Sequence, residues 1–380
     1  MGIFKEEHEI FRKSVKKFIE NEMVPHIEEW EEAGEIPRSL WKKMGEQGYL
    51  ATWVDEKYGG SGAGFEYSVV VIHELARADI GLGIASHSDI MVPYIADFGT
   101  EEQKQKWLPG CVSGDNIVSI CMSEANTGSD LQAIKTTAKR DGDYYVVNGQ
   151  KTFITNGAST DTAVVAVKTD TTAVPPSKGV SLLCIEAGTP GFIKGRKLNK
   201  LGLHSEDTSE LIFEDCRVPV SNLLYEEGRG FKCLMSELQR ERVSVTIWAQ
   251  GMAERILEDV MEYAKTREAF GKPIGCHQHN AFKIAEMATD VELGRALLDK
   301  LIEDYIAGKD IVTKVSMAKW WIAEMTNRLA YNALQLHGSY GYMEEYPIAR
   351  LYRDARAQSL YAGTTEIMKL IISRNLGFRA

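Results

Sequence analysis

The spacing of apolar residues is helical over the first third of the chain. Near the N-terminus, apolar residues recur among charged ones at the spacing of one helix face: Phe4, Phe11, Val15, Phe18 and Ile19. Pro37 predicts the first turn of another helix, because a proline there loses no helical hydrogen bond. Apolar runs over residues 67–76 and 84–98 continue the pattern, and Pro93 predicts a bend or break in the second run. These features predict an N-terminal helical domain over residues 1–118.

The pattern changes to short, β-rich runs in the middle third. Branched and aromatic residues gather in four segments: residues 144–147, 152–154, 163–167 and 180–185. Asp141-Gly142 and Asn148-Gly149 stand between such runs, and these dipeptides are typical of tight hairpin turns. Several short strands at close spacing indicate a small antiparallel barrel or sandwich. We therefore expect a central β domain over residues 119–228.

Helical spacing returns near residue 231 and persists towards the C-terminus. Four stretches are long enough to form a bundle: residues 243–265, 282–306, 312–337 and 366–374. They predict a C-terminal helical bundle over residues 229–380. The order of helices, strands and helices lacks the strand–helix alternation of parallel α/β folds, so a Rossmann fold is disfavoured.

Composition and charge narrow the class of protein. The chain has 380 residues, 44% hydrophobic and 26% charged, as expected for a soluble globular protein of two or three domains. Its formal net charge of -10 argues against binding a nucleic-acid backbone, which requires a basic surface. The six cysteines are scattered, no apolar run approaches the ~18 residues that cross a bilayer, and the N-terminus lacks a signal-peptide core. We expect a reduced, cytoplasmic protein that binds neither nucleic acid nor a membrane.

Two features that suggest nucleotide or metal binding have simpler explanations. The loop Gly59–Gly64 lacks G-x-G-x-x-G spacing, because Phe65 stands where a glycine is needed, and no strand clearly precedes it. It also fails as a G-x-S-x-G nucleophile elbow, because Ala63 replaces the final glycine. We interpret it as a turn before a helix. The eight histidines show no metal-ligand spacing, so we predict no metal site.

Five short motifs are distributed along the second and third parts of the chain. They are ICMSEANTGSD at 120–130, FITNG at 153–157, REAFG at 267–271 followed by Gln278, QLHGSYG at 335–341, and YAGTTEI at 361–367. Each alone has a plain structural interpretation. The first is a polar turn-rich loop, Arg267 is a solvated charge at a helix end, and Gly338 and Gly341 are helix caps.

In this order and spacing, the motifs resemble the acyl-CoA dehydrogenase family from Ile3 to the C-terminus, and most closely its long-chain and isovaleryl branch. The resemblance implies an N-terminal helical domain, a central antiparallel β-barrel and a C-terminal four-helix bundle. It implies FAD as the cofactor and α,β-dehydrogenation of an acyl-CoA to the trans-2-enoyl-CoA. It also implies a homotetramer that passes its electrons to electron-transferring flavoprotein.

The resemblance implies several sets of FAD contacts. The first set lies against the flavin: Ile120, Met122, Ser123, Thr127, Gly128, Ser129, Phe153, Ile154 and Thr155. The second set grips the FAD of a neighbouring subunit: Arg267, Phe270, Gln278, Gln335, Leu336, His337, Gly338 and Ser339. Thr364, Thr365 and Glu366 contact the adenosine-pyrophosphate portion. Guanidinium forks suit pyrophosphate, and backbone N–H groups at a helix start suit anions.

Two positions depart from the family pattern near the flavin. Ala125 stands where the family usually has proline, which should loosen the loop without removing a contact. Phe153 replaces the usual tryptophan, so a stacking face is kept and one N–H donor is lost. Thr155 would still offer its hydroxyl near flavin N5.

A third departure decides where the catalytic base lies. Many members of the family place a glutamate at the position of Ala362, whose side chain cannot accept a proton. The long-chain and isovaleryl branch supplies the glutamate from another helix, just before an arginine, and this corresponds to Glu241 and Arg242. A buried carboxylate suits this task because burial raises its pKa towards the working pH. The plain alternative is an exposed charge pair on a helix surface.

The resemblance also implies a set of substrate contacts: Ser129, Gln239, Arg242, Tyr361, Ala362 and Gly363. Arg242 would contact the CoA portion, and the Ala362 backbone N–H would bind the thioester carbonyl. The same base fits an acyl group on a carrier protein equally well, and a nitroalkane substrate also stays open. A DNA-binding or structural role is disfavoured by the net charge and by Glu241. An acyl-CoA oxidase is disfavoured because that group carries a further C-terminal region. The sequence does not fix the length or branching of the acyl chain.

Overall fold

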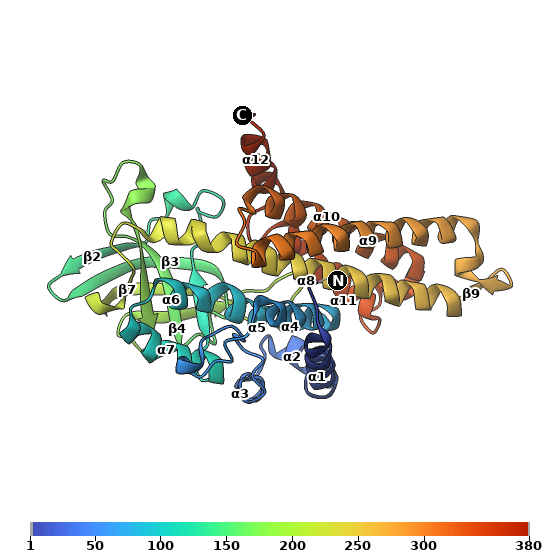
Figure 1. The fold of residues 1–380 in the computed structure, drawn as a ribbon, viewed down its shortest axis with the longest axis horizontal. Coiled ribbons are helices and arrows are strands. Elements are labelled where there is room, and N and C mark those ends of the chain that lie inside the picture. Colours follow the sequence, from blue (N-terminus) through green and yellow to red (C-terminus); the bar gives the residue numbers. More distant parts are fainter. Residues whose placement is uncertain (1–2, 379–380) are drawn as a thin grey trace.

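The computed structural model describes residues 3–378, and the predicted outer bounds of the end domains, residues 1 and 380, lie outside this range. The fold is elongated, with a β-sheet at one end and a helical bundle that extends to the other (Figure 1). The long helix α8 (Gly230–Thr266) runs from the sheet into the bundle, and α4 (Phe65–Ala78) packs along it. Because α8 spans both parts, it fixes the sheet relative to the bundle.

The N-terminal helices follow the predicted apolar pattern. Besides α4, they are α1 (Glu6–Glu22), α2 (Ile27–Ala33), α3 (Arg38–Glu46), α5 (Leu82–Ser86), α6 (Val92–Phe98) and α7 (Glu101–Ser113). The helix predicted from Pro37 is confirmed as α3, with the proline just before its first residue. Pro93 lies in the first turn of α6, after a π-helical segment at His87–Met91, so the predicted irregularity is confirmed. The Gly59–Gly64 loop turns the chain into α4, as predicted.

The central region is an open, mixed sheet, so the predicted antiparallel barrel is not confirmed. Its strands are β1 (Val118–Cys121), β2 (Thr137–Asp141), β3 (Tyr144–Thr155), β4 (Thr162–Lys168), β5 (Val180–Glu186), β6 (Phe192–Lys197), β7 (Thr208–Pro219) and β8 (Leu223–Leu224). They follow the order β6-β7-β3-β2-β4-β5-β8, with β1 paired to β4. The pairs β1–β4 and β2–β4 are parallel.

Closure would require the edge strands β6 and β8 to pair, and both are poorly suited to it. β8 has two residues, and β6 carries exposed Lys194, Arg196 and Lys197. Short strands and exposed lysines are common ways to block pairing at a sheet edge. The sheet consequently stays open at these two edges in the part of the chain that the structure describes.

One predicted hairpin is confirmed and the other is wrong. Asp141-Gly142 leads from β2 into β3, with Asp141 opposite Tyr144 and Gly142 at a φ of 62°. Asn148-Gly149 lies inside β3, where the register against β7 shifts. The Asn148 side chain accepts a hydrogen bond from the backbone N–H of Asp215 on β7 at 2.9 Å. The dipeptide therefore stabilises an irregularity between two long strands instead of a turn.

The C-terminal helices agree closely with the sequence prediction. α10 spans Val312–His337 as predicted, and α9 (Gln278–Ile306) and α12 (Thr365–Asn375) lie within a few residues of their predicted bounds. α8 begins at Gly230, earlier than the predicted 243, and α11 (Pro347–Ala355) was not predicted. The short strands β9 (Glu268–Ala269) and β10 (Lys272–Pro273) form a hairpin between α8 and α9, at the end of the molecule opposite the sheet (Figure 1).

One hydrophobic core joins the N-terminal helices to the bundle. Val15 on α1, Leu75 on α4, Trp248 on α8 and Leu301 on α9 belong to the same buried cluster. Within residues 3–378, no helix is long and apolar enough to cross a membrane. The same residues contain no group of three or more His, Cys, Asp or Glu side chains that could hold a metal ion.

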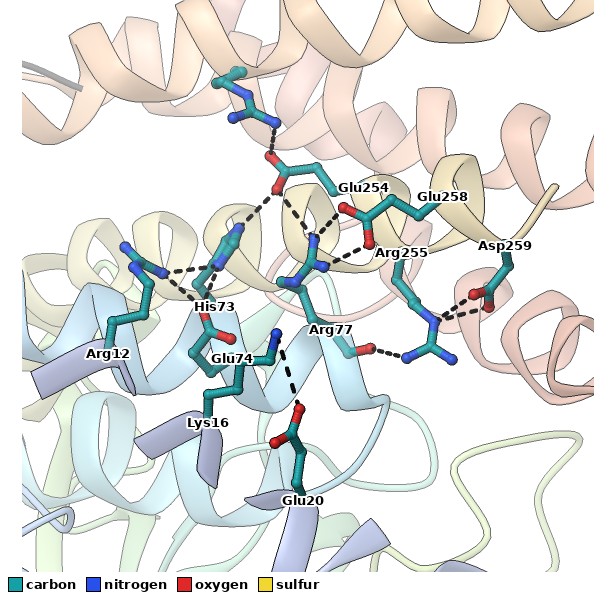
Figure 2. A network of polar contacts seen from close by, with 11 residues as sticks. Arg12, Lys16, Glu20, His73, Glu74, Arg77, Glu254, Arg255, Glu258 and Asp259 are labelled. Atoms are coloured by element: carbon teal, nitrogen blue, oxygen red, sulfur yellow. Dashed lines mark hydrogen bonds and ion pairs between the residues drawn. The ribbon is translucent and has the colours of Figure 1, made fainter. Parts of the chain in front are cut away.

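A buried polar cluster fastens the same helices to one another (Figure 2). His73 on α4 lies 3.0 Å from a carboxylate oxygen of Glu254 on α8 and 3.3 Å from one of Glu74. Arg12 on α1 donates to Glu74 at 2.6 Å, and Arg295 on α9 lies 3.1 Å from Glu254. The cluster therefore links four helices through charged groups.

Each group in this cluster shifts the pKa of its partner towards the charged form. Burial alone would lower the pKa of His73, but hydrogen bonds and charges from Glu254 and Glu74 outweigh burial and raise it above 6.5. Burial alone would raise the pKa of Glu74, but His73 and Arg12 lower it from 4.5 to about 2. His73 therefore contributes stability that is lost as pH rises through its raised pKa. Glu74 contributes stability that is lost as pH falls from 4.5 towards 2.

Replacing His73 by leucine should destabilise the protein most where the imidazole is charged. Removing one partner from a buried ion pair costs about 3–5 kcal/mol, because the remaining charges stay buried. The difference in unfolding free energy between wild type and His73→Leu should therefore shrink as pH rises from about 6 to about 10. Denaturant unfolding followed by tryptophan fluorescence measures this difference. The same substitution at the exposed His26 serves as the control. If the loss of unfolding free energy in His73→Leu stayed constant with pH, a charged imidazole would be contradicted.

Candidate active site

The two motifs predicted to face the flavin lie side by side at the sheet. The backbone N–H of Thr152 on β3 donates to the carbonyl of Ser123 in the loop after β1 at 3.0 Å. The buried Lys151 ammonium donates to the Met122 carbonyl at 3.1 Å and to the Glu124 carboxylate at 2.8 Å. These contacts hold the loop at 120–130 against the strand that carries Phe153.

Glu124 has a structural role that sequence reasoning missed. Its carboxylate accepts hydrogen bonds from the backbone N–H groups of Lys135 at 2.6 Å and Thr136 at 2.9 Å. Burial would raise its pKa, but the Lys151 charge and these hydrogen bonds lower it. Backbone hydrogen bonds between Glu124 and Thr127 close the turn around the exposed Ala125, where the family usually has proline. No local signal in the sequence indicates this role, because the burial of Lys151 and its pairing with Glu124 appear only in the structure.

Phe153 presents an open aromatic face beside this loop. It is 67% exposed and has a φ of 59°, an unusual combination for a large apolar residue. Its neighbour Ile154 is buried and Thr155 is half-buried, while Gly128 and Ser129 are exposed. Among the predicted flavin-side residues, Ile154 therefore packs in the interior, and the exposed ring of Phe153 is a surface on which a planar ring can stack. Of the others, Ile120, Met122 and Ser123 are half-buried, and Thr127 is buried.

Asn156, at the end of the same strand, was not among the predicted site residues. It has a φ of 60°, and its side-chain amide donates to the Gly83 carbonyl on α5 at 2.9 Å. The buried Glu206 accepts from the backbone N–H groups of Gly81 and Gly83 at 2.9 and 2.7 Å. These contacts fix the end of β3 against the N-terminal helices, and so position Phe153 and Thr155.

Glu241 is buried, so the alternative of an exposed charge pair is wrong. It lies on α8 with 9% of its surface exposed, and the adjacent Arg242 is 7% exposed. No hydrogen-bond partner for Glu241 Oε2 is found in residues 3–378. Burial raises the pKa of Glu241 to about 7, against the opposing charges of Arg242 and Lys319. A carboxyl with such a pKa can accept a proton near neutral pH.

The predicted substrate-binding loop lies next to Glu241. Arg242 Nε donates to the carbonyl of Ala362 at 3.4 Å, and the Lys319 ammonium donates to that of Gly363 at 2.7 Å. Ala362 has a φ of 54°. The Tyr361 hydroxyl is buried, and no partner for it is found between residues 3 and 378. Among the remaining predicted contacts, Gln239 is half-buried on α8, and Ser129 lies in the loop after β1.

A second carboxyl with a raised pKa, that of Glu237, lies one helical turn before Glu241. Burial raises the pKa of Glu237 to about 7, and the nearby Asp97 raises it further against the charge of Arg240. Arg240 is itself bonded to the buried Asp89 at 2.8 Å. Glu237 thus belongs to a polar group with Asp97, Arg240 and Asp89. The charges that act on Glu241 come instead from Arg242 and Lys319, which bond the loop at residues 361–363. Sequence reasoning did not single out Glu237, although its i, i+4 spacing from Glu241 puts both on one helix face.

A further set of predicted FAD contacts lies at the hairpin end of the molecule, opposite the sheet whose strand β3 carries Phe153 (Figure 1). Phe270 is 97% exposed, and Arg267 and Gln278 are exposed. Gln335, Gly338 and Ser339 are exposed and Leu336 is half-buried at the end of α10. The Arg267 guanidinium lies 5.3 Å from the centre of the Tyr340 ring, which brings the two motifs together.

His337 differs from its neighbours in this set. Its ring is buried, stacks on Tyr263 with centroids 4.1 Å apart, and lies 2.7 Å from the Ala333 carbonyl through Nδ1. The Tyr263 hydroxyl also donates to the His337 carbonyl at 3.2 Å. Within the chain, His337 therefore holds α10 against the end of α8, and its contact with FAD stays a prediction.

The third set opens α12, which extends away from the bundle (Figure 1). Thr364 Oγ1 accepts from the backbone N–H of Ile367 at 3.3 Å and caps the helix. The Thr365 hydroxyl donates to Glu324 at 2.6 Å, and the Glu366 side chain is exposed. The first turn of this helix thus offers backbone N–H groups to an anion.

The residues present fit the FAD that the resemblance implies. Phe153 supplies an exposed stacking face, Arg267 an exposed guanidinium, and the start of α12 a set of helix N–H groups. These are suited to a flavin ring, a pyrophosphate and an anion, respectively.

Comparison with known proteins identifies the family. Family models described as the N-terminal, middle and C-terminal domains of acyl-CoA dehydrogenase match residues 5–115, 119–216 and 228–377. The chain is 45% identical over 375 residues to the mitochondrial long-chain specific acyl-CoA dehydrogenase of Sus scrofa, covering 98% of this chain and 87% of that protein. It is 38% identical over 382 residues to the mitochondrial isovaleryl-CoA dehydrogenase of Solanum tuberosum, covering 98% and 91%.

Solved structures give the same result. An acyl-CoA dehydrogenase from Geobacillus kaustophilus is 57% identical with a TM-score of 0.98, over 98% of this chain and 99% of that one. A structure described as an electron transferring flavoprotein of Acidaminococcus fermentans is 36% identical with a TM-score of 0.94, over 98% of both chains. A glutaryl-CoA dehydrogenase from Mycobacterium smegmatis in complex with FADH2 is 29% identical with a TM-score of 0.92, over 99% and 96%. The chain therefore belongs to the acyl-CoA dehydrogenase family of FAD-dependent oxidoreductases.

Proposed function

We propose that this chain oxidises the Cα–Cβ bond of a fatty or branched acyl-CoA to the trans-2-enoyl-CoA, with Glu241 as the base that takes the α-proton. The observation that carries this proposal is the buried Glu241 carboxylate, with an unpartnered Oε2 among the described residues and a pKa of about 7. Relatives named long-chain specific acyl-CoA dehydrogenase and isovaleryl-CoA dehydrogenase support these two substrate classes.

The loop at residues 361–363 is suited to hold the thioester. No backbone carbonyl in residues 3–378 accepts a hydrogen bond from the Ala362 N–H, which is therefore available to a substrate oxygen. Such a hydrogen bond strengthens as negative charge develops on that oxygen, and it acidifies the α C–H. Glu241 then accepts the proton, and Arg242 keeps the loop in place through the Ala362 carbonyl. Bound FAD supplies the acceptor for the β-hydrogen.

We also propose that FAD sites are shared within a homotetramer. Glu241 and Arg267 lie at the two ends of one stretch of α8, and 26 residues of helix span about 39 Å at ~1.5 Å per residue. One FAD beside Glu241 is thus out of reach of Arg267 in the same chain. Exposed Phe270 and Gln278 lie at the same distant end. These groups are best used by the FAD of a second chain.

Electron-transferring flavoprotein is the acceptor that we propose, by the family resemblance. The likeness to a structure described as an electron transferring flavoprotein of Acidaminococcus fermentans supports this kind of partner. A cytoplasmic location also remains our proposal.

Glu241→Gln should keep the shape of the site and remove the proton acceptor. Flavin reduction by a good acyl-CoA should slow by about 10²–10⁴-fold, the contribution of a positioned general base. FAD content and substrate affinity should change little, because the amide still fills the site. Anaerobic stopped-flow measurement of flavin bleaching tests this rate.

Glu237→Gln is the matched control, since Glu237 lies one turn away with a similarly raised pKa. Its reduction rate should stay within about tenfold of wild type, because it bonds no part of the substrate loop. Bleaching at the wild-type rate in Glu241→Gln would show that the base lies elsewhere. A large loss confined to Glu237→Gln would identify Glu237 as that base.

The pKa of Glu241 predicts opposite effects of pH on activity and on stability. The rate of flavin reduction should rise with pH through about 7, as the carboxyl ionises. Its folded pKa is raised from 4.5, so its contribution to stability is complete below 4.5 and is lost as pH rises through about 7. Relative to Glu241→Gln, wild type should lose about 3 kcal/mol of unfolding free energy across this range. Denaturant unfolding at pH 4.5 and 8.5 measures this difference. If the unfolding free energies of wild type and Glu241→Gln changed equally with pH, a raised pKa of Glu241 would be contradicted.

Arg267→Ala should weaken FAD binding without unfolding the chain that carries it. A hydrogen bond to a charged group contributes about 1.5–3 kcal/mol, so FAD affinity should fall by roughly tenfold or more. Lys265→Ala, an exposed change two residues away, is the control. FAD titration measures affinity, and light scattering should give a multiple of 42.4 kDa for the FAD-loaded protein. A monomer with full FAD occupancy would rule out a shared site.

A further inference from the structure

We propose that Lys319 is a positioning residue of this active site, which fixes the substrate loop and compensates the charge of the base. The inference rests on the proposed function, in which Glu241 takes the proton and Ala362 binds the thioester carbonyl. Lys319 lies on α10, belongs to none of the five motifs, and is 2% exposed.

The Lys319 ammonium connects both ends of the substrate loop. It donates to the carbonyl of Gln358 at 2.8 Å and to that of Gly363 at 2.7 Å. These two carbonyls flank the segment that contains Tyr361 and Ala362. An ammonium has three donors, so two of them are used for the loop. One buried side chain therefore fixes the entry and the exit of this segment.

The loop requires such fixation because its backbone is unfavourable. Ala362 has a φ of 54° and the following Gly363 a φ of 93°. A non-glycine residue in this region persists only where its surroundings determine the conformation. Arg242 bonds the Ala362 carbonyl from one side, and Lys319 bonds the Gly363 carbonyl from the other. These contacts fix the two peptide units on either side of Gly363, next to the unit that carries the Ala362 N–H.

Lys319 on α10 also lies close enough to Glu241 on α8 for its charge to act on the proposed base. Its charge and that of Arg242 are the two that oppose the raised pKa of Glu241. Burial lowers the pKa of Lys319 itself to about 8, with a further lowering by Arg242, against the charges of Glu241, Glu324 and Glu366. Tyr94 on α6 and Glu237 on α8 also lie in the electrostatic range of Glu241. Below pH 8, Lys319 is therefore a cation that favours the ionised base.

Two substitutions separate the two roles. Lys319→Met removes the donors and the charge, whereas Lys319→Gln removes the charge but keeps an N–H donor on a side chain one atom shorter. In both variants the pH midpoint of flavin reduction should move upward, because the Glu241 carboxylate loses a compensating cation. Lys314→Met on the same helix is the control, since its partner Asp304 keeps Lys309 at 2.8 Å and Lys300 at 3.3 Å.

The loop role is measured by binding, without turnover. The trans-2-enoyl-CoA carries the thioester carbonyl, and its thioether analogue lacks it. Lys319→Met should weaken binding of the enoyl-CoA by about three- to tenfold, the effect of one misplaced hydrogen bond. Binding of the thioether should stay unchanged, and Lys319→Gln should restore part of the loss.

The outcomes distinguish this proposal from the proposed function. An unmoved pH midpoint and an unmoved enoyl-to-thioether binding ratio in Lys319→Gln, with Glu241→Gln still inactive, would overturn the role of Lys319 alone. Full activity in Glu241→Gln would overturn the base instead. If Lys319→Met fails to fold, Lys319→Gln still decides the charge role through its pH midpoint. A variant could also lose stability or FAD while its pH midpoint and its enoyl-to-thioether binding ratio stay at wild-type values. Lys319 would then have only a structural role, and the proposal would be overturned.

Discussion

The burial of one ionisable carboxylate constrains the rest of the active site. As the proposed base, Glu241 would have to be charged to accept a proton, yet an unpaired charge is strongly disfavoured in a protein interior. The chain places two buried cations near it, Arg242 from the same helix and Lys319 from α10. Both also bond carbonyls of the loop at 361–363. The same side chains therefore compensate the charge of the proposed base and hold the loop that we propose binds the thioester.

The helix α8 connects the active-site contacts to the rest of the fold. It presents Glu241 near the sheet, Glu254 to the polar cluster around His73, and Arg267 at the hairpin end. A continuous helix keeps the distances between such positions fixed. The cluster around His73 then holds the N-terminal helices against α8, and Asn156 connects the sheet to α5. The precision of the site depends on contacts far from the reacting atoms.

Periodic features of this fold could be predicted from sequence, and long-range ones could not. α10 was predicted to the residue because its apolar pattern persists over seven turns, whereas the hairpin at Asn148-Gly149 was wrong because pairing with β7 overrides a local turn preference. Barrel closure likewise depends on two edge strands far apart in sequence. The burial of Glu241 was anticipated from the chemistry it would perform. The Lys151–Glu124 pair and the contacts of Lys319 join residues too distant in the chain for any local pattern to reveal.

The pKa of Glu241 reflects a balance between burial, which raises it, and the charges of Arg242 and Lys319, which lower it. Burial without cations would raise the pKa above 7 and leave the carboxyl protonated at neutral pH. Cations without burial would lower it and leave a weak base. An apolar ligand beside the carboxyl would exclude further water and shift this balance towards the protonated form. The two buried cations would oppose that shift, because Coulomb interactions strengthen as water is excluded.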